Sequence, residues 1–213
     1  MPRGASVSPT SGAFTLPRVT TIGVLGLQGD VAEHLAILDR CGAEGVSVKH
    51  AHQFAEVDGL IIPGGESTTI GKLLARFELL EPLTAAIADG LGVFGTCAGA
   101  ILLAREALHH DGTVSEQHLL GAMDTTVRRN AFGRQVDSFE ADLHVEGIDG
   151  GPIHAVFIRA PIIERAGPDV EVLACVGDTI VVCRQGPLLA SSFHPELTDD
   201  PRLHQEFIGM VSS

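Results

Sequence analysis

The sequence has few basic residues and no long apolar run. Its 14 lysines and arginines stand against 27 acidic residues, which gives a formal net charge of −13 at pH 7. This imbalance argues against nucleic acids and anionic membrane surfaces as partners, because both are bound by basic faces. The uncharged apolar runs all fall short of the ~18 residues that a membrane-spanning helix needs. Small molecules and other proteins remain as the expected partners.

Cysteine is also scarce. The four cysteines lie far apart and form no Cys-x-x-Cys pair, a spacing typical neither of a zinc site nor of a secreted disulfide framework. We therefore expect a cytoplasmic protein. Residues 1–18 contain Pro, Ser and Gly throughout and lack the continuous apolar stretch of a secretory signal. We predict a flexible extension there and a single domain over 19–213, which is long enough to bury one full core.

The first half of the sequence alternates strand and helix patterns. Nearly all-apolar strands are predicted at 20–27, 46–50, 58–62 and 91–96, and helices at 31–44, at 68–90 in two pieces separated by Pro82, and at 98–108. After about residue 125 the pattern changes to short strands and hairpins, with a turn at 177–178, and the chain closes on an amphipathic helix over 201–211. These patterns predict an α/β fold: an open, mostly parallel sheet with helices on both faces and antiparallel additions late in the chain.

Cys97 lies where the fourth predicted strand passes into a helix, between Gly95 and Gly99. This is the thiol counterpart of the G-x-S-x-G nucleophile elbow, in which the glycines permit a sharp turn that lifts the side chain clear of the sheet. The following helix favours the thiolate, and the Ala98 N–H would face an oxyanion on the attacked carbon. The alternative is a small buried hydrophobe, as most free cysteines are. A suitably placed base would decide between them.

His194 is the histidine best placed to be that base. It follows an apolar strand, and Glu196 stands two residues later, so both side chains point to one side if the backbone stays extended. The carboxylate would then hold the imidazole tautomer and complete a nucleophile, base and orienter with Cys97. A His-Pro-Glu turn that only caps the strand is the alternative. The other histidine groups, at 50–52 and 109–118, lack the convergent ligands of a metal site, and no metal is predicted.

Two glycine patterns bear on ligand binding. Gly64 and Gly65 end the third predicted strand, and a backbone N–H of this loop, which we assign to Gly65, would be the second oxyanion donor. Gly23, Gly26 and Gly29 are spaced G-x-x-G-x-x-G, which differs from the dinucleotide fingerprint G-x-G-x-x-G. No phosphate role follows from them, and no cofactor is predicted.

Six segments, in this order, carry a resemblance to a known family: GLQGD (26–30), LIIPGGESTT (60–69), GTCAG (95–99), RRNAFGRQVDSFEADL (128–143), VFIRAP (156–161) and SSFHPELT (191–198). They resemble the class I (triad) glutamine amidotransferases, whose fold is flavodoxin-like, and more narrowly the glutaminase subunits of pyridoxal 5'-phosphate synthase. The resemblance implies that L-glutamine is hydrolysed to L-glutamate and ammonia through a glutamyl thioester on Cys97. His194 would move the protons, and Glu196 would orient it.

The resemblance also implies a glutamine site, made by Gly65, Glu66, Ser67, Arg129, Ile158 and Arg159. A free amino acid needs a guanidinium for its carboxylate and an acceptor for its ammonium group. Arg129, Arg159 and Glu66 offer these groups. Either arginine taken alone would favour a surface salt bridge, and only its place within the family motifs makes it a binding candidate.

The family further implies a partner, a separate (β/α)8-barrel synthase subunit that receives the ammonia within a large hetero-oligomer. GLQGD resembles the stretch that meets this subunit and helps set the oxyanion hole. A glutaminase that serves a different acceptor synthase is the alternative. The related stress-protein and peptidase group is disfavoured, because there a histidine directly follows the elbow cysteine, where this chain has Ala98.

Overall fold

The computed structural model describes residues 18–129 and 138–212. Nearly all of the extension predicted at 1–18 and part of the RRNAFGRQVDSFEADL segment therefore lie outside the described residues. The helical elements of the described residues are α1 (Val31–Arg40), η1 (Ala51–Ala55), α2 (Ser67–Arg76), α3 (Leu80–Ala88), α4 (Ala98–Leu103), η2 (Pro195–Leu197) and α5 (Arg202–Val211), where η marks a 3-10 helix. The strands are β1 (Thr21–Leu25), β2 (Glu44–Val48), β3 (Gly59–Ile62), β4 (Gly92–Thr96), β5 (Ala104–Leu108), β6 (Met123–Arg128), β7 (Ser138–Leu143), β8 (Ile153–Ile158), β9 (Ile162–Ala166), β10 (Glu171–Val176), β11 (Thr179–Gln185) and β12 (Leu188–Ser191).

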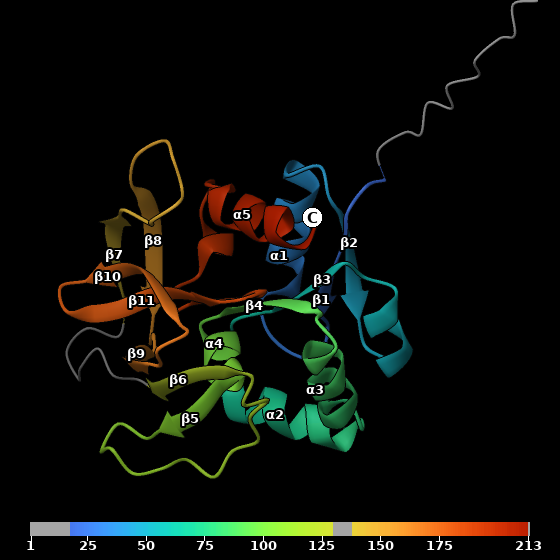
Figure 1. The fold of residues 1–213 in the computed structure, drawn as a ribbon, viewed down its shortest axis with the longest axis horizontal. Helices are drawn as coiled ribbons and strands as arrows, with labels where there is room; N and C mark the ends of the chain where they lie inside the picture. The colour runs from blue at the N-terminus through green and yellow to red at the C-terminus, as the bar shows by residue number, and fades with distance from the viewer. Residues whose placement is uncertain (1–17, 130–137, 213) are drawn as a thin grey trace, which may run out of the picture.

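One large sheet forms the centre of the molecule, in the order β2-β1-β3-β4-β12-β11-β9-β6-β5, with β10 paired to β11 (Figure 1). The five strands from β2 to β12 are mutually parallel. Beyond them, β11 and β9 add antiparallel strands, and β7 with β8 forms a separate antiparallel hairpin. The prediction of a mostly parallel α/β sheet with late antiparallel additions is confirmed.

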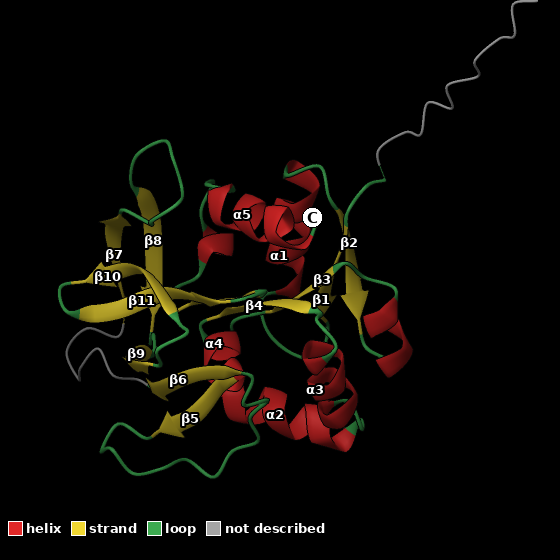
Figure 2. Ribbon diagram, in the orientation of Figure 1, coloured by secondary structure: helices red, strands yellow, loops and turns green. Residues whose placement is uncertain are grey.

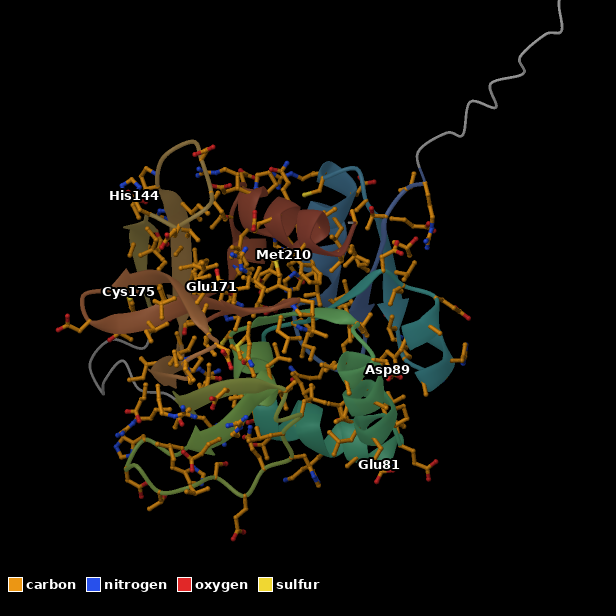
Figure 3. All side chains as sticks on the ribbon, in the orientation of Figure 1. Glu81, Asp89, His144, Glu171, Cys175 and Met210 are labelled. Carbon is orange, nitrogen blue, oxygen red and sulfur yellow. The ribbon has the colours of Figure 1, made fainter. Side chains whose placement is uncertain are left out.

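Helices cover both faces of this sheet, as Figure 2 shows. α1 and α5 pack on one face, where Leu38, Leu203 and Phe207 are buried against inward-facing strand residues. α2, α3 and α4 pack on the other face, in a second cluster that includes Leu74 and Leu83. Side chains fill the space between the sheet and both helix layers (Figure 3). None of the helices in the described residues is both long and apolar enough to cross a membrane.

The predicted helix over 98–108 is wrong in its second half. α4 ends at Leu103, and the backbone turns at Ala104 (φ −61°, ψ 149°) into β5. The sequence AREAL has good helix formers, but here β5 pairs in parallel with β6 and buries Ala104 and Ala107 in the core. Pairing and burial therefore override the local helix propensity.

The predicted break at Pro82 is also wrong. Pro82 lies in the first turn of α3, where a proline removes no helical hydrogen bond. The helical segment is instead interrupted earlier in the sequence: α2 ends at Arg76, and Glu78 has a φ of +57°. The predicted turn at 177–178 is confirmed, because it joins β10 to β11 with Gly177 at a φ of +56°.

Candidate active site

Cys97 occupies a sharp turn at the centre of the sheet. β4 ends at Thr96 and α4 begins at Ala98, so Cys97 alone makes the turn, with a φ of +48° and a ψ of −99°. This conformation is rare for a residue with a side chain and is characteristic of functional sites. The Cys97 N–H donates to the Ser191 carbonyl at 2.8 Å and ties the turn to the end of β12. The structure therefore has the nucleophile-elbow geometry that the sequence predicts.

The glycines on either side of the elbow are required by close packing. A Cβ on Gly95 would stand 2.5 Å from the backbone carbon of Gly99. A Cβ on Gly99 would collide with the carbonyl oxygen of Ile62 on the neighbouring strand β3. Because backbone cannot move aside as a flexible side chain can, larger residues at these positions would push α4 away from the sheet.

His194 reaches the elbow because β12 lies beside β4 in parallel register, with Ser191 opposite Thr96. The His194 N–H donates to the Val156 carbonyl at 2.9 Å, which fixes the loop after β12. Its Nδ1 lies 2.7 Å from Glu196 Oε1, and both side chains are buried. Since a carboxylate only accepts, Nδ1 carries the hydrogen and the other ring nitrogen is left for Cys97.

The charges of this group are strongly coupled. Burial lowers the pKa of His194, but hydrogen bonds with Cys97 and Glu196, together with their charges, outweigh burial and raise the pKa to about 10. Burial raises the pKa of Glu196, and the hydrogen bond and charge of His194 only partly oppose this. The site therefore favours the imidazolium form of His194, which can give a proton to a leaving group.

Two residues near His194 carry site contacts that the sequence analysis did not assign. Asp30 Oδ2 lies 3.3 Å from His194 Nδ1. Gln28 Oε1 accepts a hydrogen bond from the Glu66 N–H at 2.9 Å. Both belong to the GLQGD segment, which the resemblance linked to the oxyanion hole and the partner. The sequence therefore pointed to this segment, but it did not predict the contacts of the two residues.

One group in the described residues has the spacing of metal ligands, namely Asp30, His194 and Glu196, whose ligand atoms lie within 4.8 Å of one another. The short hydrogen bond between His194 and Glu196 already uses the ring nitrogen that such an ion would need. The arrangement fits proton transfer better than metal binding.

A cavity of about 370 Å³ opens in front of Cys97. Its lining combines the elbow with loops from both halves of the chain. The lining residues are Gln28, Asp30, Gly65, Glu66, Ser67, Cys97, Ala98, Ile101, Arg129, Ile158, Arg159, Pro161, His194 and Leu197. Every residue proposed from the sequence lies on this wall except Glu196, which stands behind His194. The structure therefore brings together segments that lie as far apart in the sequence as Gln28 and Leu197.

Glu66 organises one wall of the cavity. Its carboxylate caps α2 by accepting from the backbone N–H groups of Thr68 and Thr69, at 3.1 and 2.7 Å. Arg129 Nη2 lies 3.0 Å from Glu66 Oε1. Burial raises the pKa of Glu66, but the hydrogen bonds from Thr69 and Thr68 outweigh it and lower the pKa. The wall therefore presents an ionised carboxylate and a guanidinium side by side.

Backbone strain recurs around the cavity. Gly65 has a φ of +150°, which side chains rarely adopt, and its neighbour Gln28 would be 2.7 Å from an added Cβ. Arg159 has a φ of +44°. Strained residues cluster where function constrains the backbone, and here Cys97 and Arg159 face the same cavity as Gly65, whose positive φ glycine adopts without strain.

A cysteine elbow at the end of a parallel α/β sheet, facing a histidine that a glutamate orients, defines the class of α/β proteins built for acyl transfer by a thiol. Residues 24–213 match the SNO glutamine amidotransferase family, and the chain belongs to that family.

Curated relatives and solved structures agree with this assignment. The chain is 62% identical over 192 residues to "Pyridoxal 5'-phosphate synthase subunit PdxT" of Frankia casuarinae, covering 90% of this chain and 95% of the relative. It is 56% identical to the protein of the same name from Nocardia farcinica, covering 96% and 91%. A crystal structure titled as a glutamine amidotransferase superposes with a TM-score of 0.84 at 51% identity, covering 90% of this chain and 99% of that one.

Proposed function

We propose that this protein is the glutaminase subunit of a pyridoxal 5'-phosphate synthase and that it hydrolyses L-glutamine to L-glutamate and ammonia. Membership of a glutamine amidotransferase family and the PdxT relatives at 56–62% identity support this function. The observation that carries the mechanism is the elbow: Cys97 is held at a φ of +48° on the wall of the cavity that His194 also lines, and Glu196 orients His194 from 2.7 Å.

The proposed reaction has two halves. In the first, the Cys97 thiolate bonds to the side-chain amide carbon of glutamine, the C–N bond breaks, and the imidazolium of His194 gives its proton to the departing ammonia. In the second, His194 takes a proton from water, whose oxygen attacks the glutamyl thioester. The C–S bond then breaks, glutamate leaves, and the thiolate and imidazolium are restored. Glu196 keeps the imidazole in one tautomer and stabilises its charged form.

The oxyanion of each tetrahedral intermediate needs backbone donors. We propose the N–H groups of Ala98 and Gly65, because both residues line the cavity beside Cys97. Ala98 is the first residue of α4, so its N–H has no partner within the helix. Gly65 stands at the end of β3, one strand away from the elbow.

We propose that glutamine lies against Gly65, Glu66, Ser67, Arg129, Ile158 and Arg159. The ionised Glu66 suits the α-ammonium group, and Arg129 and Arg159 offer charge to the α-carboxylate. Ile158 is 37% exposed on the cavity wall and gives the substrate's methylene groups an apolar contact. Residues 19–213 would act as a single amidotransferase domain.

The proposed ammonia acceptor is a (β/α)8-barrel synthase subunit with which this chain would form a large hetero-oligomer. The names of the relatives support a synthase partner. A different acceptor synthase stays the alternative. Solved structures titled as a putative GMP synthase subunit and as PurLQS share this fold, at 18% and 16% identity. That likeness concerns the fold alone.

The experiment is a glutaminase assay with and without the candidate synthase, using wild type and Cys97→Ala. We expect the variant to fold, bind the synthase and release no glutamate above background. Glutamine hydrolysis retained in Cys97→Ala would refute the proposed mechanism. Identification of the protein that co-purifies with this chain from its own cells tests the acceptor, and a synthase other than the pyridoxal phosphate barrel would favour the alternative.

A further inference from the structure

A buried pair of histidines lies directly behind the triad. His34 belongs to α1 and His204 to α5, two helices that lie side by side on one face of the sheet (Figure 1). Both residues are 0% exposed, and neither lines the cavity in front of Cys97. Burying imidazoles costs free energy unless their nitrogens are hydrogen-bonded, so their contacts indicate what the pair does.

His34 lies near the carboxylate oxygen of Glu196 that His194 does not contact. His34 Nε2 lies 3.5 Å from Glu196 Oε2 and 3.2 Å from Thr96 Oγ1. The other oxygen of Glu196 already accepts from His194. Glu196 Oε2 has no hydrogen-bond partner of ordinary geometry among the described residues, so His34 is the donor best placed to reach it.

The positions of the hydrogens follow from these contacts. We assign the hydrogen to His34 Nε2, because its two neighbours are the Thr96 hydroxyl, which can accept, and a Glu196 carboxylate oxygen, which only accepts. His34 Nδ1 then presents a lone pair. His204 Nε2, at 2.9 Å, then donates to that lone pair. This leaves His204 Nδ1 without a hydrogen, which agrees with its lack of a hydrogen-bond partner among the described residues.

Both rings are neutral in this scheme. Burial, with the charges of neighbouring histidines, lowers the pKa of His34 well below its ordinary value. Burial and the charge of Arg40 lower the pKa of His204 to about 3. A neutral pair can donate to Glu196 without competing with His194 for its charge.

We propose that His34 is a positioning residue of the triad: its Nε2–H is shared between Thr96 Oγ1 and Glu196 Oε2 and holds the carboxylate with Oε1 on His194, while His204 keeps that hydrogen on Nε2. A carboxylate held at one oxygen can rotate, and rotation would release His194. Burial also favours the uncharged form of Glu196, and Asp30 adds to this, so a second donor helps to keep Glu196 ionised beside His194. This inference rests on the proposed glutaminase function.

The test compares His34→Leu and His34→Gln with wild type, each assayed for glutamate release together with the synthase partner. His34→Leu removes the donor, and we expect kcat to fall about tenfold while KM for glutamine stays within about twofold, because the substrate contacts are intact. His34→Gln places an amide N–H near the position of Nε2, so we expect it to recover kcat to within about threefold of wild type. A His34→Leu enzyme with the kcat of wild type would overturn the proposal.

A second pair of variants avoids direct contact with Glu196 and serves if His34→Leu fails to fold. His204→Gln keeps a donor toward His34, whereas His204→Leu removes it, so kcat should fall several-fold only in the leucine variant. Leu203→Ala is the structural control, since Leu203 is 1% exposed on the same helix and its side chain is apolar. An equal loss of kcat in Leu203→Ala would assign the effect to general loosening and refute a positioning role.

The outcomes for the two proposals are separable. Wild type that releases no glutamate with the synthase present, or a fully active Cys97→Ala, contradicts the glutaminase function itself. An active wild type with an inactive Cys97→Ala leaves that function standing, and the His34 and His204 variants then decide the positioning role alone.

Discussion

Gly64→Ala should disable the triad although none of its three residues is replaced. A Cβ on Gly64 would stand 2.7 Å from His194 Nδ1 and closer still to His194 Cε1. Non-bonded heavy atoms prefer separations of about 3.5 Å or more, so the imidazole would have to retreat by on the order of 1 Å. The ring cannot do so freely, because Glu196 holds it at 2.7 Å and it must also reach Cys97.

The expected magnitude follows from this displacement. A misplacement of about 1 Å costs an enzyme on the order of 10²-fold in rate, or about 2.7 kcal/mol of transition-state stabilisation. The measurement is kcat/KM for glutamate release with the synthase partner present. Overpacking should also lower the free energy of unfolding, by about 1–3 kcal/mol. Urea denaturation therefore has to show that the variant is folded under the assay conditions.

Gly209→Ala is the matched control. Gly209 lies within α5, and an added Cβ would meet nothing within 4 Å. Alanine there should leave activity unchanged and stabilise the helix by about 0.5–1 kcal/mol. If Gly64→Ala is folded and retains more than about a third of the wild-type kcat/KM, the inferred crowding of His194 is wrong.

Three further predictions concern charged residues. Arg129→Ala should raise KM for glutamine much more than it lowers kcat, because Arg129 would hold the ground-state substrate on the cavity wall. Glu66→Ala should cost about 1 kcal/mol of unfolding free energy through loss of the α2 cap. Because hydrogen bonds from Thr69 and its neighbour lower the pKa of Glu66 in the fold, this contribution is present above the ordinary pKa of 4.5 and disappears as the pH falls through the folded value. His154 behaves oppositely: hydrogen bonds to Asp142 and a neighbouring glutamate raise its pKa, so its contribution is full below pH 6.5 and lost as the pH rises through the folded value.

The Arg129 prediction has a matched control variant, and the other two predictions are tested by their dependence on pH. Arg128→Ala removes the adjacent arginine, which is absent from the cavity wall and pairs with Glu164 instead, so KM should not change. An equal KM for Arg129→Ala and wild type would exclude the assigned contact. For Glu66 and His154, the difference in urea midpoint between wild type and Glu66→Ala or His154→Gln is followed against pH. For either variant, a difference in urea midpoint that does not vary with pH would contradict the prediction for that residue.

Local features of the sequence predicted much of the site. The elbow is set by the glycines within two residues of Cys97, and the orienting pair by the two-residue spacing of His194 and Glu196. Such short-range geometry can be derived from residue type and spacing, because few backbone conformations satisfy it. The apolar strand patterns likewise predicted the parallel sheet, and the structure confirms it.

Features that depend on tertiary pairing were missed or misread. The segment after Leu103 has helix-forming residues, yet it becomes β5 because β6 is available beside it. Pro82 looked like a helix break, but it sits in the one turn of α3 that tolerates proline. Neither the strand after Leu103 nor the start of α3 before Pro82 is determined by the few neighbouring residues. Hydrophobic periodicity alone therefore could not predict them.

What the sequence determined by itself is the chemistry: a thiol on a turn, an imidazole beside a carboxylate, and a sheet to carry them. What only the tertiary structure decided is which distant groups meet. Strand β12 lies beside β4 and so brings His194 to Cys97, Arg129 reaches Glu66, and His34 meets His204 across 170 positions of sequence. These meetings depend on strand order and helix packing, which arise from burial summed over the whole chain rather than from any local pattern.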